Sequence, residues 1–255
     1  MSSTPFDLES VFEVDDYLYF YSASLTDERT DAEVAALVLL LQLENSSQRI
    51  LDLACGYGRH ANRLAALGHR LTGIELMSGF LALARRDAEA RRVMVDYRQG
   101  DIRQLDFKDE FDRVMLLFTA FGYFDDAENL QVLRNVQRAL KPGGLFLMDV
   151  PNRDTFLRHY QPSIVIERDG NLMIDRVTMD SLNGRMVNNR VVIRNGVRKD
   201  KPFSVRLYNP GELRAVLEQA GLEIVRLLGG WDASPVSIDS RRLVVIAKKP
   251  DLPAG

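Results

Sequence analysis

The 255-residue sequence contains a single cysteine, Cys55, so no disulfide can form within the chain. Absence of disulfides is typical of reducing compartments, and we expect a cytoplasmic protein. Long apolar runs are also missing, since the longest, Val34–Leu41, is shorter than a membrane span. The amino-terminal stretch is acidic and lacks the basic and apolar regions of a signal peptide. We therefore expect neither a secretory leader nor a membrane partner.

An excess of positive charge is absent as well. The chain has 33 Lys and Arg residues against 36 Asp and Glu residues, which gives a formal net charge of −3. Such a chain has no general field that attracts phosphate backbones, and we expect no nucleic-acid partner. Its length is sufficient for one large α/β domain, or for one domain with an insertion.

The stretch Arg49–Arg59, RILDLACGYGR, carries the most information. Its apolar run is typical of a strand buried on both faces. Asp52 interrupts that run, and a buried acid is costly unless it has a partner. The turn Gly56-Tyr57-Gly58 follows, and then a helical pattern ends at Gly68. This order predicts a nucleotide site, because glycines let a ligand approach the backbone and a helix N-terminus offers free N–H groups.

Two interpretations of this unit compete. A second apolar strand, Leu71–Ile74, ends at Glu75, where an acid can accept both hydroxyls of a ribose. The segment Gly56–Ala61 fits the G-x-G-x-x-A form of dinucleotide enzymes. The segment Asp52–Gly58, by contrast, resembles the first motif of the class I S-adenosylmethionine (SAM) dependent methyltransferases, with Ala54 in place of the usual first glycine.

The rest of the first half alternates strands with helices. Strands are predicted at Val93–Tyr97, Phe111–Phe118 and Leu145–Val150. Helices are predicted at Asp31–Leu43, opened by a capping box at Thr30, at Gly79–Ala90, capped by Ser78, and from Asp125 to Leu140. Between the last helix and strand, Lys141-Pro142-Gly143-Gly144 resembles the segment that class I methyltransferases place before their fifth strand. Such alternation demands a parallel sheet with right-handed crossovers.

The pattern changes after Pro151. Four antiparallel strands are predicted over roughly residues 161–208, with turns at Gly170-Asn171, Asn183-Gly184 and Asn195-Gly196. A helix, Glu212–Ala220, and two last strands, Leu222–Leu227 and Leu243–Lys248, follow. We predict an α/β fold with a Rossmann-like class I methyltransferase sheet of seven strands, the last one antiparallel, and an antiparallel β insertion after strand 5. The expected parts are an N-terminal lid segment (1–29), a SAM-binding core (30–160), the insertion (161–208) and the C-terminal part of the core (209–249).

The resemblance implies SAM as the cofactor and assigns residues to it. The turn Asp52–Gly58 would face the methionine part of SAM, and Glu75 would hold the ribose hydroxyls. The cofactor-binding residues predicted in this way are Tyr21, Asp52, Ala54, Gly56, Gly58, Glu75, Leu76, Met77, Asp101, Ile102 and Phe118. Asp101 would accept from the adenine amino group. Tyr21 is chosen with Tyr17 as a lid residue, because the two share a face on a helix or on a strand.

We predict a SAM-dependent methyltransferase that transfers a methyl group to a nitrogen or oxygen atom of a small molecule. Its catalytic residues are unknown, with Tyr21 and His159 as candidates, and we expect no metal. The insertion is expected to shape the acceptor pocket or a face of a homodimer. A nicotinamide oxidoreductase and a non-catalytic SAM-binding protein are the alternatives. A nucleic-acid methyltransferase is disfavoured, because Phe118–Phe121 replaces the Asn/Asp-Pro-Pro-aromatic motif of the amino-DNA methylating enzymes.

Overall fold

The computed structural model describes residues 7–251, so residues 1–6 of the predicted lid segment lie outside the described residues. Its main sheet has seven strands in the order β10-β11-β5-β4-β1-β2-β3. They are β1 (Arg49–Leu53), β2 (Arg70–Glu75), β3 (Val95–Gln99), β4 (Phe111–Leu116), β5 (Leu140–Pro151), β10 (Glu223–Leu228) and β11 (Arg242–Lys248). The last strand, β11, runs antiparallel to both of its neighbours, and the other pairs are parallel. The predicted fold class is confirmed.

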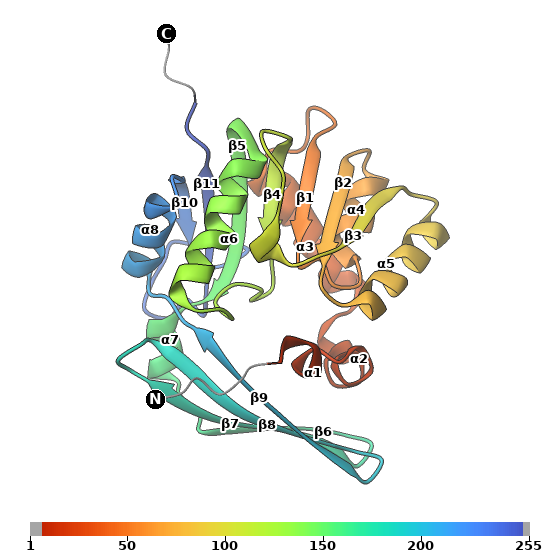
Figure 1. Cartoon of the computed structure of the whole chain (residues 1–255), viewed down its shortest axis with the longest axis vertical. Coiled ribbons are helices and arrows are strands. Elements are labelled where there is room, and N and C mark those ends of the chain that lie inside the picture. Colours follow the sequence, from red (N-terminus) through yellow and green to blue (C-terminus); the bar gives the residue numbers. More distant parts are fainter. Residues whose placement is uncertain (1–6, 252–255) are drawn as a thin grey trace.

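Helices cover both faces of this sheet (Figure 1). One face holds α3 (Asp27–Leu40), α4 (Arg59–Ala66) and α5 (Ser78–Arg91), and the other holds α6 (Asp126–Ala139) and α8 (Pro210–Gln219). Successive strand residues point to opposite faces. Leu51 and Leu53 therefore pack with α6 and α8, whereas Ile50 packs with α3 and α4. Each central strand is buried on both sides, which explains why its residues are mostly apolar.

The start of α3 differs from the prediction. The helix begins at Asp27, and its N-cap is Thr26, whose hydroxyl accepts from the Arg29 N–H. Thr30 is therefore an interior residue, and its hydroxyl donates to the carbonyl of Thr26 at 2.9 Å. The predicted capping box at Thr30 was wrong, because another threonine, Thr26, lies one turn earlier and caps the helix there. Glu33, assigned to that box, instead contacts Arg59.

The Lys-Pro-Gly-Gly segment also differs from the prediction. The helix α6 ends at Ala139, and β5 starts directly at Leu140, so the segment lies inside the strand. The register between β4 and β5 jumps from Phe111 opposite Leu140 to Arg113 opposite Leu145. The extra residues form an irregularity in the strand rather than a turn that separates helix from strand.

Three smaller features also differ from the prediction. The strand β3 starts and ends two residues later than predicted, at Val95–Gln99. Ser78 is the first residue of α5 and not its cap, since Met77 occupies the N-cap position. The first turn of the insertion falls on Asp169 and Gly170, which have φ values of +48° and +74°.

The insertion is a separate four-stranded antiparallel sheet in the order β6-β7-β8-β9. It follows the short helix α7 (Arg153–Arg158) and comprises β6 (Ser163–Arg168), β7 (Asn171–Asp180), β8 (Arg185–Arg194) and β9 (Val197–Arg206). The predicted turn at Asn195 and Gly196 is confirmed. Both residues have positive φ, as a tight two-residue hairpin turn requires.

The N-terminal helices α1 (Leu8–Val11) and α2 (Val14–Tyr21) lie between the main sheet and the insertion (Figure 1). Ion pairs attach α2 to the insertion. The carboxylate of Asp16 lies 2.8 Å from the ammonium of Lys201 and 3.1 Å from the guanidinium of Arg194. Lys201 is only 2% exposed, and its ammonium also contacts Glu13. Because an unpaired buried charge is costly, this cluster fixes the position of α2. No helix among residues 7–251 is both long and apolar enough to cross a lipid bilayer.

The turn after β1 allows a stability test with a matched pair of glycines. Gly56 and Gly58 both have positive φ, but only at Gly58 would an added Cβ collide, 2.1 Å from the Tyr97 hydroxyl. We expect Gly56→Ala to cost about 1–2 kcal/mol in free energy of unfolding, from the left-handed backbone alone. Gly58→Ala should cost about 1–3 kcal/mol more, because Tyr97 must move. Denaturant unfolding checks this, and equal losses in the two variants would contradict it.

Candidate active site

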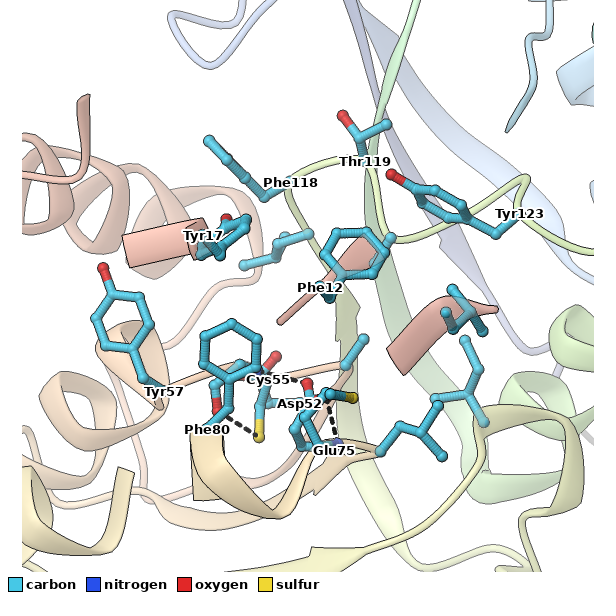
Figure 2. A pocket seen from close by; sticks show the side chains of 18 of the residues that line it. Phe12, Tyr17, Asp52, Cys55, Tyr57, Glu75, Phe80, Phe118, Thr119 and Tyr123 are labelled. Atoms are coloured by element: carbon cyan, nitrogen blue, oxygen red, sulfur yellow. Dashed lines mark hydrogen bonds between the residues drawn. The ribbon is translucent and has the colours of Figure 1, made fainter. Parts of the chain in front are cut away.

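A cavity lies at the carboxyl ends of β1, β2 and β4, where open α/β sheets bind ligands. The strands supply its floor, and the N-terminal helices supply its cover. Figure 2 shows that aromatic side chains, among them Phe12, Tyr17 and Phe80, face the same space as the acids Asp52 and Glu75. A flat apolar ligand part and a polar one can therefore bind in the same cavity.

Glu75 stands at the end of β2 and holds the glycine turn. One of its carboxylate oxygens accepts from the Gly56 N–H and the other from the Met77 N–H, each at 2.9 Å. Burial raises the pKa of Glu75, and these backbone hydrogen bonds oppose the rise. The carboxylate lines the cavity and has lone pairs beyond those two bonds, so it can accept further donors.

Asp52, in β1, is almost fully buried and lines the same cavity. Burial raises the pKa of Asp52 to about 8, with the positive charge of Arg59 partly offsetting the rise and the charge of Glu75 adding to it. Ala54, two residues after Asp52, has φ +51°. This left-handed conformation explains why a glycine is usual at that position, and why an alanine there carries a small strain.

Asp101 begins the loop after β3 at the cavity wall. Burial acts to raise its pKa, but hydrogen bonds from the side chain and backbone of Arg103 hold the pKa below its ordinary value. The Arg103 guanidinium donates to Asp101 at 2.6 Å and lies on the Phe124 ring, 4.3 Å from its centroid. Arg103 therefore occupies lone pairs of the Asp101 carboxylate that an adenine amino group would also need.

Most of the predicted cofactor residues come together in the structure. The predicted residues that line the cavity are Asp52, Ala54, Gly56, Glu75, Leu76, Met77, Asp101, Ile102 and Phe118. Gly58 does not line it and instead occupies the N-cap position of α4, close to Tyr97. Tyr21 does not line it either, because its hydroxyl accepts from Arg190 at 3.0 Å. The roles of these residues toward a ligand remain predictions.

Several lining residues were not among the predicted cofactor-binding residues, although one of them, Tyr17, was predicted as a lid residue. Tyr17, one turn before Tyr21 on α2, lines the cavity, and its ring lies 5.4 Å from that of Phe80, edge to face. The prediction that Tyr17 and Tyr21 share a face indicated both residues, but it did not indicate which of the two rings lies nearer the cavity. Phe12 and Tyr123 carried no spacing signal, since contacts between distant elements bring them here.

Arg59 also lines the cavity and was missed. It is the first residue of α4 and is 7% exposed. Its Nη1 donates to the carboxylate of Glu33 and to the hydroxyl of Thr30. His60 contacts the same Glu33 carboxylate at 2.9 Å. Burial acts to raise the pKa of Glu33, but His60 and Arg59 hold it at about 2, so the carboxylate is ionised.

A second cavity lies between the insertion and the main sheet. It shares Thr119 and Tyr123 with the first, so the two meet at the loop after β4. His159, a predicted catalytic candidate, lines this second cavity and not the first. Asp175 and Arg190 pair within its wall, at 2.7 Å. Among residues 7–251 there is no group of three or more His, Cys, Asp or Glu side chains that could hold a metal ion.

The parallel sheet, the glycine turn and the acid after β2 define a nucleoside-binding fold of the class I methyltransferase kind. A family model described as "Methyltransferase domain" matches residues 50–144. The dTDP-4-amino-2,3,4,6-tetradeoxy-D-glucose N,N-dimethyltransferase of Saccharopolyspora spinosa is 31% identical over 78% of this chain and 81% of its own length. The chain belongs to the SAM-dependent methyltransferases, and SAM is its cofactor.

Two further comparisons also match proteins that are described as methyltransferases. The structure of the CcbJ methyltransferase from Streptomyces caelestis aligns with a TM-score of 0.80 at 23% identity, covering 96% of this chain and all of that chain. A relative from Geobacillus sp. (strain WCH70) is 29% identical over 60% of this chain, and the alignment spans 63% of that relative's length. The first of these supports the fold alone.

The raised pKa of Asp52 predicts pH-dependent cofactor binding. Below about pH 8 the empty cavity holds a neutral Asp52, whereas a cationic ligand favours the carboxylate, so binding releases a proton. We expect the affinity for SAM, whose sulfonium is cationic, to rise between pH 6 and 8 by up to about tenfold per unit and then to level off, as measured by calorimetry. Asp52→Asn should flatten this rise, and an identical slope in the variant would show that another group titrates.

Proposed function

We propose that the protein transfers the methyl group of SAM to the nitrogen of a small-molecule amine. The relative from Saccharopolyspora spinosa is by its name an amino-sugar N,N-dimethyltransferase, and it aligns over most of this chain. The first cavity would hold SAM, and we call it the cofactor cavity. The observation that carries the proposal is the second cavity, which meets the cofactor cavity at Thr119 and Tyr123. An acceptor held there can approach a methyl group in line, as transfer by displacement needs.

The walls of the second cavity favour a compact acceptor of mixed polarity. Apolar side chains such as Phe156, Val177 and Phe203 line it together with a similar number of polar or charged ones. Asp175 and Arg190 face each other in a bidentate pair, whereas Arg241 adds a positive charge to the wall that can face an anionic group of the acceptor. This composition supports a small molecule that combines apolar parts with polar and charged groups.

Nitrogen is favoured over oxygen as the accepting atom. A neutral amine has a free lone pair and needs no base in the transfer step, whereas a hydroxyl needs its proton removed. His159 lies in the second cavity, but no carboxylate contact to its ring orients it as a base among the described residues. Positioning and exclusion of water can therefore carry the reaction of an amine.

A panel of acceptors tests this proposal. The protein is incubated with SAM and with matched pairs of amino and hydroxy deoxysugars, including dTDP-4-amino-2,3,4,6-tetradeoxy-D-glucose. We expect release of S-adenosylhomocysteine with N-methylated product from the amino member of at least one pair, and a slower or absent reaction of the hydroxy member. Reaction of the hydroxy members alone, or of none of the compounds in a SAM-binding preparation, would contradict the proposal.

We expect the acceptor to donate a hydrogen bond to the side chain of Asn188, in β8. Its side chain lines the second cavity, and the residue is 2% exposed. The amide oxygen Oδ1 is buried without a hydrogen-bond partner among residues 7–251. A buried carbonyl left unpaired costs free energy, and an N–H or O–H of a bound acceptor would remove that cost.

We therefore expect Asn188→Ala to raise the KM for the acceptor found in the panel by about tenfold. The dissociation constant for SAM, measured by calorimetry, should stay the same, because Asn188 does not line the cofactor cavity. Asn189→Ala is the matched control, since Asn189 is the exposed neighbour on the opposite face of β8. Equal effects of the two substitutions would show that Asn188 does not contact the acceptor.

A further inference from the structure

The two faces of the insertion sheet have different surroundings. Every second residue along its strands, for example Asp175, Asn188 and Phe203, lines the second cavity between the insertion and the main sheet. Successive strand residues point to opposite faces, so the residues in between point away from the main sheet (Figure 1). We call the side that they form the outer face of the insertion.

The outer face carries an apolar patch. No hydrophobic core cluster among residues 7–251 includes these apolar residues. One of them, Val165, is 56% exposed. The patch consists of Val165, Leu172, Ile174, Val187, Val191 and Ile193. Because contiguous apolar surface outside the core marks interaction sites, we searched this face for a partner that fits it.

Strand pairing arranges the outer face in rows that run across the four strands. One row consists of Glu167, Leu172, Ile193 and Arg198, and the next consists of Val165, Ile174, Val191 and Asp200. The first row has an anion on the edge strand β6, a cation on the edge strand β9 and apolar side chains between them. Such a row is complementary to a second copy of itself that is turned end for end.

We infer that the outer face of the insertion binds a second copy of this chain, with a two-fold axis that runs parallel to the strands between β7 and β8. Under this axis Glu167 faces Arg198 of the second copy, and Leu172 faces Ile193 of the second copy. Packed sheets align to within about 30°, and the long side chains of Glu167 and Arg198 can span the shift that this rotation causes. A two-fold interface uses the same patch on both copies, so each contact occurs twice.

Two other ways of joining two copies fit the outer face less well. A two-fold axis perpendicular to the strands, through the row of Ile174, would set Leu172 against the charge of Arg176 of the second copy. It would also leave Glu167 opposite Ser163 instead of a cation. Edge-to-edge pairing of the two β6 strands would leave most of the apolar patch in water. The axis parallel to the strands therefore matches both the apolar and the charged residues.

The size of the outer face is sufficient for such an assembly. Three of its strands are ten residues long. With strands about 4.8 Å apart and a rise of about 3.3 Å per residue, the four-stranded face covers roughly 600 Å². Two copies would bury roughly 1,200 Å² in total, which lies at the lower end of specific interfaces. We therefore expect a dimer that dissociates measurably on dilution.

Sedimentation equilibrium of the full chain tests the inference. The unchanged protein should sediment at twice the chain mass of 28.9 kDa. Glu167→Lys and Arg198→Glu should each raise the dissociation constant of the dimer by about tenfold or more, because each places like charges together at two sites. The double variant Glu167→Lys/Arg198→Glu exchanges the charges and should return the dissociation constant to within about threefold of the original. Both side chains are exposed, so circular dichroism should show folded variants.

Arg226→Glu is the matched control, because it makes the same change of charge at an exposed position on β10, in the main sheet. Its dissociation constant should equal that of the unchanged protein. An unchanged protein that stays monomeric up to about 0.1 mM overturns the inference. Single variants that dimerise as tightly as the unchanged protein also overturn it. Failure of the double variant to regain the dimer overturns the two-fold arrangement and with it the inference.

Discussion

The carboxylate of Glu75 ties together the two loops on which the cofactor cavity is built. Its oxygens accept from the backbone of Gly56, after β1, and of Met77, after β2. The ends of two neighbouring strands thereby keep a fixed spacing, and the glycine turn is held open toward the cavity. Burial of an acid at this depth is tolerable because the backbone N–H groups replace its water. The residue that shapes the turn also offers its remaining lone pairs to a ligand.

The insertion affects both cavities, although it lies outside the main sheet. Asp16 attaches α2 to the buried Lys201 of β9, and Tyr21 on the same helix contacts Arg190 of β8. Tyr17, between these two anchors, lines the cofactor cavity. Any shift of the insertion sheet therefore moves a wall of the cofactor cavity as well as the wall of the second cavity.

The loop after β4 is the place where the two cavities meet, and its backbone is strained. Phe118 and Thr119 both have positive φ, at +58° and +66°. The guanidinium of Arg242, in β11, donates to the Thr119 hydroxyl at 3.0 Å, and the Thr119 N–H donates to the carbonyl of Asp149 in β5. Such conformations persist only where surrounding contacts over-determine them, and they gather at functional sites. The terminal strand β11 thus helps to position the proposed transfer site.

The sequence by itself determined the order of the elements, the seven-stranded sheet, the insertion and the acids at the carboxyl ends of β1 and β2. The order of the elements, the insertion and the two acids follow from short-range patterns, in which apolar runs and glycine turns act within a few residues, whereas the seven-stranded sheet was predicted from the resemblance to the class I methyltransferases. Even there, the local pattern placed the N-cap of α3 at Thr30, whereas the structure has it at Thr26. Tertiary structure alone decided that Arg59 lines the cofactor cavity, that Tyr17 lines it while Tyr21 does not, and that Asn188 lines the second one. These placements depend on contacts between residues far apart in the chain, whose geometry no local spacing records.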